Sequence, residues 1–575
     1  MLEQFIKNRI IAQLPFEANE GQRELLDKLA QFIISPTPRK AFILRGYAGT
    51  GKTSIMAALV QAMKDLNQRI VLLAPTGRAA KVLSKYAHVP AYTIHKYIYR
   101  ARTKGAPSLE ARGDEAMRRW GDEATRRWGD EAMRREARGK EQFTLRDNLH
   151  KNTLFIVDEA SMISGNGQWA MGNGQALFGS GNLLDDLVRF VYSSEGCSLL
   201  LLGDDAQLPP VGSTQSPALS EEYMAGYQLD IHSHTLTEVA RQANDSGILA
   251  NATRLRPLAL GGRSLEDGAL RLQDATLSLQ FRGEEDFWDI LEFGKDVQTV
   301  SGTELLEVLE QSYNEVGEEE TILLTRTNKR TNIYNQGIRA RILWREDEIS
   351  NGDRLMVVKN NYFWTEKYED LPFLANGDML EVVRLRNERE MYGYHFADVE
   401  LRSLDYDWEI DAVLWLDTLS SDNPEANNLM HKDLFWKIAE DYPELQHNKK
   451  KLAEAIIESP YYNALQARMA YAITGHKSQG GQWERVFIDP NIGGAIRREG
   501  DEARRRWGDE AIRREGDEAR RRWGDEAIRR EGDEARRRWG DEAMRRKGDE
   551  AREFYRWLYT AITRATKKVY FIKNN

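Results

Sequence analysis

Gly46-Tyr47-Ala48-Gly49-Thr50-Gly51-Lys52-Thr53 reads G-x-x-x-x-G-K-T, and this stretch decides the fold of the first half of the chain. The apolar run 41–44 precedes it, and apolar residues at helical spacing follow over 53–63. A strand, a glycine-rich turn and a helix in this order point backbone N–H groups and the helix N-terminus at phosphate oxygens. Lys52 is placed to neutralise the outer phosphates and Thr53 to hold Mg²⁺. The motif predicts a nucleoside triphosphate site.

An acidic pair, Asp158-Glu159, follows the apolar run 154–157. Two acids alone would ordinarily be a solvated loop at a strand end. Beside a P-loop they favour phosphoryl transfer, which needs one carboxylate for Mg²⁺ and a second group to orient the attacking water. We assign Asp158 to the metal and Glu159 to the water, so the pair predicts hydrolysis in addition to binding.

A third polar segment, Gly203 to Gly212, follows the apolar run 199–202, where the nucleotide would also lie. Within it, Gln207 is placed to contact the γ-phosphate and to report its loss. The alternative is an ordinary proline-containing turn around Pro209-Pro210. We take Gln207 as a catalytic candidate.

Short runs rich in leucine or β-branched residues recur along the chain and end abruptly in polar, glycine or acidic residues. This is typical of buried parallel strands whose loops carry ligands. The runs are 41–44, 70–73, 154–157 and 199–202 in the first half, and 321–324, 485–488 and 569–572 in the second. They predict an α/β fold with two lobes. Between them, alternating segments such as 379–383 and 395–401 predict a small β-rich insert in the second lobe.

Composition narrows the class of protein. At 575 residues the chain has room for about three or four domains. Its net charge of −9, from 81 basic and 90 acidic residues, argues against binding nucleic acid by bulk charge, although a basic groove on an acidic body stays possible. A single cysteine, Cys197, excludes a disulfide framework and a Cys-based zinc site.

No stretch of the sequence indicates a membrane segment. Residues 1–14 lack the uninterrupted apolar stretch of a signal peptide. No run approaches the roughly 18 apolar residues of a membrane span. We expect a cytoplasmic protein with no membrane partner.

Two stretches repeat an eight-residue unit. GDEAMRRW, GDEATRRW and GDEAMRRE run from Gly113, and GDEARRRW alternates with GDEAIRRE from Gly500 to about Ala551. A third biased stretch, 165–182, repeats GNGQ. Arginine with tryptophan could form a nucleic-acid surface. However, the charges nearly cancel, and a glycine in every unit costs about 1 kcal/mol per helical site relative to alanine. We therefore favour inert, surface-looped insertions whose local structure is a charged helix.

The ordered set of motifs resembles the RecD-like, Dda-like branch of superfamily 1B helicases, which are P-loop proteins with two RecA-like lobes. The resemblance covers nearly all the chain outside the repeats. Its motifs are Gln22, the P-loop, Ala74 to Ala80, Thr93-Ile94-His95, Asp158 to Ser161, Gly203 to Gly212, Glu238 to Gln242, Tyr471 to Gly480 and Trp557 to Ala565.

The resemblance implies ATP and Mg²⁺ as cofactors, and it adds residues to the ATP site. Gln22 would read the adenine, and Gly480 would lie at the nucleotide. Arg241 and Arg564 would be arginine fingers that reach the γ-phosphate when the cleft between the lobes closes. Either arginine alone would more often be a surface or salt-bridge residue.

The resemblance also implies a track for single-stranded DNA across the tops of both lobes. The implied DNA-binding residues are Pro75, Thr76, His95, Thr474 and His476. Hydroxyl and backbone N–H groups hold phosphates without reading bases, which suits a motor that must accept any sequence. For each histidine alone, a buried structural role would be the ordinary interpretation.

From these segments we predict the domain boundaries. Lobe 1A would span 1–245, with an insertion at about 100–148 and a Gly/Asn-rich loop at 165–182. Lobe 2A would span 246–345 and 459–575, with an insertion at about 495–552, and an SH3-like insert 2B would span 346–458. The family usually carries a strand-separating hairpin where the first repeat lies here. We therefore expect the insertion to affect unwinding more than folding or ATPase activity.

We expect a monomeric ATP-dependent DNA helicase that moves 5′ to 3′ on single-stranded DNA and acts at junctions of single-stranded and duplex DNA. One alternative is an RNA-directed helicase of the same superfamily, because no base-reading or 2′-hydroxyl-reading module is evident. A second is a DNA clamp that binds ATP but whose insertions uncouple it from turnover.

Overall fold

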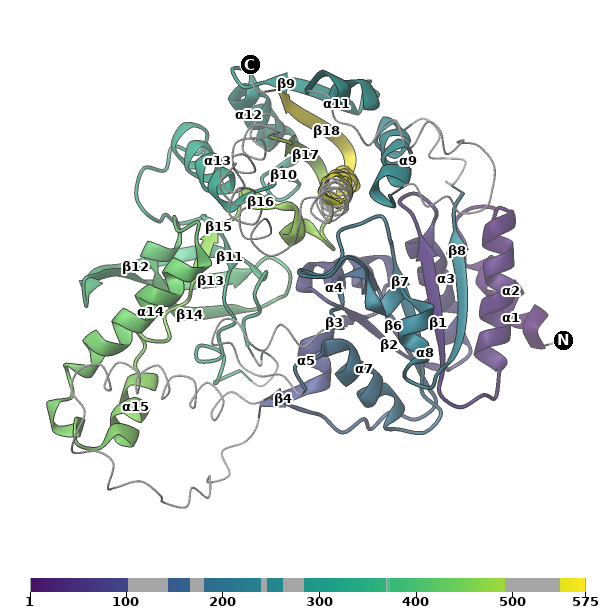
Figure 1. Ribbon diagram of the computed structural model, residues 1–575, viewed down its shortest axis with the longest axis horizontal. Helices are drawn as coiled ribbons and strands as arrows, with labels where there is room; N and C mark the ends of the chain where they lie inside the picture. The colour runs from purple at the N-terminus through teal and green to yellow at the C-terminus, as the bar shows by residue number, and fades with distance from the viewer. Residues whose placement is uncertain are drawn as a thin grey trace, which may run out of the picture.

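The computed structural model describes residues 2–101, 143–165, 180–238, 246–261, 284–368, 371, 373–491 and 549–573. Figure 1 shows two α/β lobes side by side and a third, antiparallel sheet next to the second lobe. Within the described ranges, no helix is long and apolar enough to cross a membrane. Both octad repeats lie outside them, except for the last residues of the second, as does most of the loop 165–182.

Lobe 1, residues 2–236, is built on a six-stranded sheet. Its strand order is β3-β2-β6-β7-β1-β8, and every neighbouring pair is parallel. The strands are β1 (Lys40–Gly46), β2 (Arg69–Ala74), β3 (Ala91–Thr93), β6 (Thr153–Val157), β7 (Ser198–Gly203) and β8 (Asp230–Leu236). Since the P-loop follows β1, the acidic pair follows β6 and β7 lies between these two strands, three predicted loops meet at one edge of the sheet.

Alternate residues of these strands point to opposite faces, and helices cover both faces. Phe42, Leu44 and Leu72 pack with the helices α1 to α4. Ile43 and Phe155 pack on the other face with α5 and α7. These helices are α1 (Leu2–Ala12), α2 (Glu20–Ile34), α3 (Lys52–Asp65), α4 (Gly77–Ala87), α5 (Ile94–Ile98) and α7 (Leu183–Tyr192), and the short α8 (Glu221–Ala225) precedes β8. Burial on both faces explains why the strands read as unbroken apolar runs.

Lobe 2 has a parallel five-stranded sheet in the order β16-β10-β17-β18-β9. The strands are β9 (Val297–Ser301), β10 (Thr321–Thr325), β16 (Ala472–Thr474), β17 (Trp483–Asp489) and β18 (Ala565–Lys573). One face packs with α9 (Gly247–Ala259), α11 (Glu284–Ile290) and the helix at 549–562, and the other with α12 (Leu305–Val316) and α13 (Asn328–Arg341). The predicted fold class of two α/β lobes with parallel sheets is therefore confirmed.

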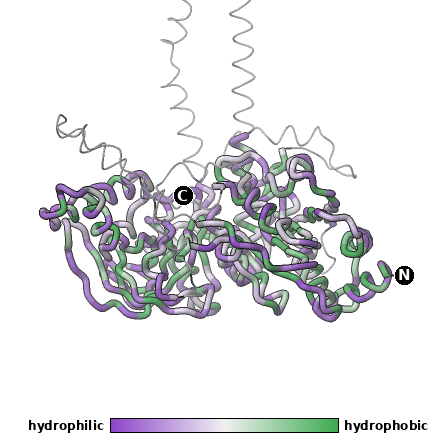
Figure 2. The backbone as a smooth tube through the Cα atoms, turned by 90° about the horizontal axis from the view of Figure 1, so that it is seen from below, coloured by the Kyte–Doolittle hydropathy of each residue, from purple (hydrophilic) through white to green (hydrophobic). Residues whose placement is uncertain are grey.

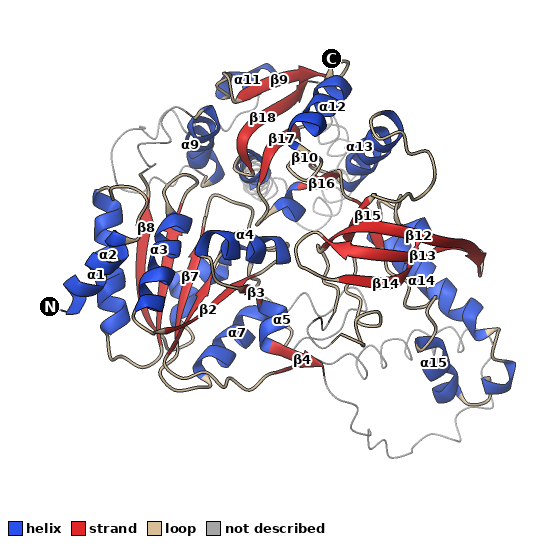
Figure 3. Ribbon diagram, turned by 180° about the vertical axis from the view of Figure 1, so that it is seen from behind, coloured by secondary structure: helices blue, strands red, loops and turns tan. Residues whose placement is uncertain are grey.

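The insert is an antiparallel sheet in the order β14-β13-β12-β11-β15. Its strands are β11 (Arg354–Val357), β12 (Met379–Met391), β13 (Tyr394–Ser403), β14 (Glu409–Trp415) and β15 (Ala467–Met469), and it is flanked by α14 (Pro424–Ala439) and α15 (Lys449–Ile457). Figure 3 shows α14 crossing behind the strands. The insert thus contains helices as well as the predicted strands, its last strand lies beyond residue 458, and the SH3-like label stays a prediction.

A two-stranded antiparallel sheet projects from lobe 1 on either side of the first repeat. β4 (Tyr99–Ala101) pairs antiparallel with β5 (Phe143–Leu145), in the register Tyr99 to Leu145 and Ala101 to Phe143. Residues 102–142, which include the first repeat, lie outside the described residues. The repeat is therefore inserted between two paired strands and not into the sheet of lobe 1.

The two lobes share an apolar junction. Tyr47, Ala206 and Leu208 of lobe 1 belong to the same buried cluster as the lobe 2 residues Trp557 and Leu558. Figure 2 shows hydrophobic and hydrophilic stretches alternating along the chain. The predicted boundary between residues 245 and 246 falls between β8 and α9, and it stays a prediction.

Candidate active site at the junction of the lobes

The P-loop connects β1 to α3 and curls back on itself. Gly49 and Gly51 have φ values of 76° and 86°, in the left-handed region that favours glycine. A Cβ on Gly46 would lie 2.9 Å from two carbons of the Lys52 side chain, so this position has no room for a larger residue. The glycines therefore fix the closed path that a phosphate cradle requires.

Lys52 and Gln22 both contact the loop. The Lys52 ammonium donates hydrogen bonds to the carbonyl oxygens of Gly46 and Tyr47, the second at 3.1 Å. Gln22, which is 1% exposed, donates from Nε2 to the Thr50 carbonyl at 3.0 Å, while its Oε1 accepts from Asn19 N–H. The structure thus places Gln22 against the P-loop, where its amide braces the loop.

The acidic pair lies at the end of β6. Glu159 has a φ of 50°, a strained value for a residue other than glycine, and its N–H donates to Asp158 Oδ1 at 2.9 Å. Burial and the neighbouring Glu159 raise the pKa of the Asp158 carboxyl above its ordinary value. Such a site favours a bound cation, which would restore the charge balance of the buried carboxylate.

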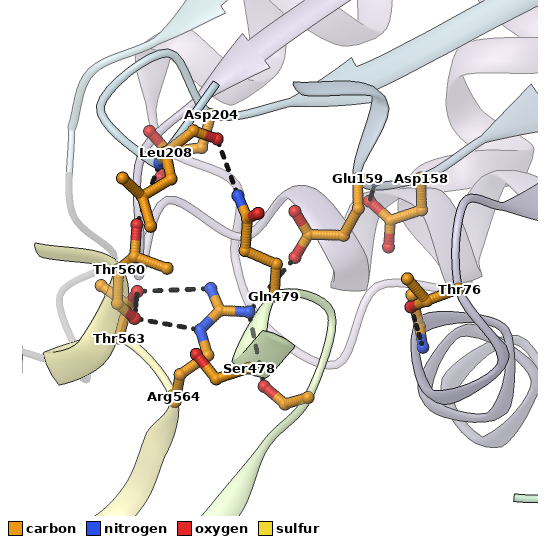
Figure 4. Close-up of polar contacts among 12 residues, drawn as sticks. Thr76, Asp158, Glu159, Asp204, Leu208, Ser478, Gln479, Thr560, Thr563 and Arg564 are labelled. Atoms are coloured by element: carbon orange, nitrogen blue, oxygen red, sulfur yellow. Dashed lines mark hydrogen bonds and ion pairs between the residues drawn. The ribbon is translucent and has the colours of Figure 1, made fainter. Parts of the chain in front are cut away.

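Arg564 reaches this acidic pair from lobe 2. Its Nη1 lies 3.5 Å from Glu159 Oε1, and the Arg564 side chain is almost fully buried (Figure 4). Three hydrogen bonds orient the guanidinium: to the carbonyls of Thr560 and Gly481 at 3.1 and 3.4 Å, and to the Thr563 hydroxyl at 3.3 Å. A positive charge from one lobe is therefore held beside the predicted catalytic acid of the other.

The loop after β7 is held from both lobes. Asp204, 1% exposed, accepts from Ala206 N–H at 3.0 Å and from the Tyr559 hydroxyl of lobe 2 at 2.7 Å. Burial raises the pKa of Asp204 above its ordinary value. Leu208 donates its N–H to Thr560 Oγ1 at 3.0 Å, and its carbonyl accepts from Gln479 Nε2 at 2.7 Å. Lobe 2 therefore binds both backbone polar groups of Leu208 in this loop.

Gln207 lies in the same loop and is 7% exposed. Its Oε1 is a buried oxygen with no hydrogen-bond partner in the part of the chain that the structure describes. An acceptor left unsatisfied at a buried site ordinarily has a ligand or water to bind. The position suits the predicted contact with the γ-phosphate or with the attacking water.

The residues at this edge of the sheet fit a Mg²⁺ ion. Thr53 supplies a hydroxyl in the first turn of α3, and Asp158 supplies a buried carboxylate after β6. Oxygen donors of this kind, completed by waters and phosphates, are the ligands that Mg²⁺ takes in such sites. Within the described ranges no group of three or more His, Cys, Asp or Glu side chains forms an all-protein metal cage, and the Thr53 and Asp158 pair fits Mg²⁺ held together with the nucleotide.

The predicted DNA-binding residues lie on both sides of the junction. Thr76 caps α4 and accepts from Ala79 N–H at 3.2 Å, and Thr474 ends β16. Burial lowers the pKa of His95 to about 4 and lowers that of His476, so both imidazoles are neutral at pH 7 and would meet DNA as hydrogen-bonding groups. All five predicted residues, Pro75 included, are half-buried.

Gly480 and Arg241 are the two predicted ATP-site residues whose place at the nucleotide the described structure does not show. A Cβ on Gly480 would lie 2.6 Å from Ala79 Cβ and 3.0 Å from Thr76 Oγ1, so the nearest neighbours of Gly480 belong to α4 and not to the P-loop. The contact of Gly480 with the nucleotide stays a prediction. Arg241 lies outside the described residues, and its role stays a prediction.

The sequence interpretation did not assign four residues that hold the junction together: Asp204, Gln479, Tyr559 and Thr560. All four lie inside motifs that the sequence displays. The available signal was a polar group among buried apolar neighbours, as in Trp557-Leu558-Tyr559-Thr560. Their partners lie hundreds of residues away, so spacing along the chain does not reveal them.

One family model matches part of the first lobe. The family described as AAA domain matches residues 17–171. An uncharacterised protein of Acanthamoeba polyphaga mimivirus is 24% identical over 527 residues, covering 82% of this chain and 93% of the relative.

Solved structures of Pif1 helicases are also similar. The Bacteroides protein in complex with ADP-AlF3 and ssDNA is 14% identical with a TM-score of 0.36, covering 82% of this chain and 86% of that one. The Candida albicans protein is 14% identical with a TM-score of 0.34, covering 97% and 95%. These matches do not single out the RecD-like branch.

The P-loop, the acidic pair beside it and the AAA-domain match together describe an ATP-binding site equipped for hydrolysis. The site lies at the junction of two lobes that each contribute charged side chains to it.

Proposed function

We propose that this chain is a Mg²⁺-dependent ATPase that moves 5′ to 3′ along single-stranded DNA and displaces the complementary strand. Its motifs resemble those of superfamily 1B helicases, and residues 17–171 match the AAA domain family. The observation that carries the proposal is the ion pair between Arg564 of lobe 2 and Glu159 of lobe 1, at the P-loop edge of the sheet. A hydrolytic site completed by a second lobe can open and close with each turnover.

In this mechanism the P-loop amides and Lys52 bind the β- and γ-phosphates, and Lys52 leaves its present carbonyl partners to do so. Thr53 and Asp158 would hold Mg²⁺, which supplies charge neutralisation on the phosphates. Glu159 orients the attacking water and accepts its proton. Arg564 then pairs with the γ-phosphate in place of Glu159 and stabilises the charge that develops as the phosphoryl group is transferred.

DNA movement follows from the same closure. Thr76 lies on lobe 1 beside α4, Thr474 lies on lobe 2, and Gly480 packs against Thr76 between them. Any change in the angle between the lobes alters the spacing of these groups. Two phosphate-binding patches that approach and separate in turn, with alternating grip, move a strand in one direction.

A strand-displacement assay tests this proposal. Duplexes with a 5′ tail or a 3′ tail are mixed with the full chain, Mg²⁺ and ATP, and the released strand is measured. We expect release from the 5′-tailed duplex only, and none with Lys52→Ala. Release from the 3′-tailed duplex alone would refute the polarity, and release from RNA substrates only would favour the RNA-directed alternative. ATP binding without turnover would identify the uncoupled clamp.

A further inference from the structure

Tyr559 connects lobe 2 to two separate parts of the ATP site. It lies in the helix at 549–562 and is 1% exposed. Its hydroxyl accepts a hydrogen bond from the Ala48 N–H of the P-loop at 2.9 Å and donates one to Asp204 Oδ2 at 2.7 Å. Burial, together with the charge of Asp204, raises the pKa of Tyr559 well above its ordinary value, so the phenol keeps the proton that this arrangement requires.

The Ala48 amide is also one of the predicted phosphate-binding groups. It carries a single hydrogen, so a strong hydrogen bond to a phosphate oxygen and one to the Tyr559 hydroxyl exclude each other. Phosphate oxygens are charged and attract an amide more strongly than a neutral hydroxyl does. Nucleotide at the P-loop would therefore displace Tyr559 from Ala48.

Displacement of Tyr559 would act on the loop that follows β7. The new position of the Tyr559 hydroxyl would decide whether Asp204 keeps its hydrogen bond to it. Loss of this bond would be costly, because Asp204 is a buried carboxylate. The next residue of the helix, Thr560, holds Leu208 N–H, and Gln479 holds the Leu208 carbonyl. A shift of this helix therefore reaches Gln207, which lies between Asp204 and Leu208 in the loop.

We propose that Tyr559 is a positioning residue that competes with the nucleotide for the Ala48 amide. It would so transmit the state of the P-loop to its own helix in lobe 2 and, through Asp204, to the loop after β7. This inference rests on the proposed ATPase function, because it names the contact through which that site controls the second lobe. It assigns the tyrosine no part in bond making or breaking.

The test is Tyr559→Phe, which keeps the ring and removes only the hydroxyl. Loss of the competitor should tighten binding of ATP several-fold, while loss of the link to Asp204 should lower the DNA-stimulated kcat about tenfold, the effect of one buried hydrogen bond to a charged group. A merely structural role would weaken nucleotide binding or leave it unchanged. Tyr555→Phe, the same change at a buried position one turn earlier in the helix, is the matched control and should alter neither value.

A double-mutant cycle provides the second measurement. In an Asp204→Asn background, Tyr559→Phe should change kcat by less than about threefold, because residues that act through one contact are not additive. Additive losses, or unchanged ATP affinity in Tyr559→Phe, would overturn the inference. If the unmodified chain fails to hydrolyse ATP with DNA present, the proposed function fails and this inference falls with it. If the unmodified chain and Tyr559→Phe both show normal DNA-stimulated turnover, only the inference is refuted.

Discussion

Replacing Arg564 with alanine removes the charge that lobe 2 contributes to the ATP site. The guanidinium is 4% exposed and is held by two carbonyls and a hydroxyl, so its position is fixed before the nucleotide binds. Pre-positioned charge stabilises a transition state without reorganisation. The substitution should therefore lower kcat far more than it weakens nucleotide binding.

The size of the effect follows from the geometry. Arg564 now lies 3.5 Å from a carboxylate oxygen of Glu159. A unit charge at about 4 Å from a phosphate oxygen, at an effective dielectric constant of about 20, contributes about 4 kcal/mol. Since about 1.4 kcal/mol is a tenfold change in rate, Arg564→Ala should lower kcat about a thousandfold.

Steady-state ATP turnover with saturating single-stranded DNA measures kcat, and calorimetry measures the Kd of ATP under non-hydrolysing conditions. Arg564→Lys should recover part of the rate, because it keeps the charge and loses the fork geometry. Lys567→Ala removes an exposed lysine paired with Glu484 and serves as the control, with no expected change. A kcat within about fivefold of the unmodified chain would refute the role given to Arg564.

Three further predictions concern other parts of the chain. Gln22→Ala should raise the KM for ATP about tenfold, because the Gln22 amide braces Thr50 of the P-loop, and initial-rate kinetics would show it. Chelation of Mg²⁺ with EDTA should abolish turnover reversibly, and activity that persists in EDTA would contradict the role of Thr53 and Asp158. Burial holds the pKa of His431 at about 3, below its unfolded value, so the folded insert binds fewer protons than the unfolded chain. The free energy of unfolding should therefore fall as the pH drops below about 6.5, by about 2 kcal/mol at pH 5. Urea unfolding of His431→Gln should show a smaller loss of stability over the same pH range.

The sequence predicted those parts of the fold in which one local pattern suffices. The runs 41–44, 70–73, 154–157 and 199–202 became β1, β2, β6 and β7, since a parallel strand covered on both faces must be apolar throughout. β8 was missed because it contains His232, Ser233 and His234 and forms an edge of the sheet, where polar side chains are tolerated. The helices α14 and α15 were missed because the turn signals around 350–420 dominated the interpretation of the insert.

The candidate site divides in the same way. Lys52, Asp158, Glu159 and Arg564 follow from motifs, because phosphoryl transfer restricts the residue types that can serve. The contact from Tyr559 to Ala48 spans 511 residues and depends on the angle at which the lobes meet. Such a contact is a product of tertiary packing, so neither propensity nor spacing predicts it.

The central claim is that one ATP site, shared by two lobes, responds to DNA. The most direct measurement is the rate of ATP hydrolysis by the full chain, with and without a single-stranded oligonucleotide that has no secondary structure. The account predicts that DNA raises the rate at least about tenfold and that Lys52→Ala removes turnover in both conditions. A rate that is the same with and without DNA, or turnover that survives Lys52→Ala, would contradict it.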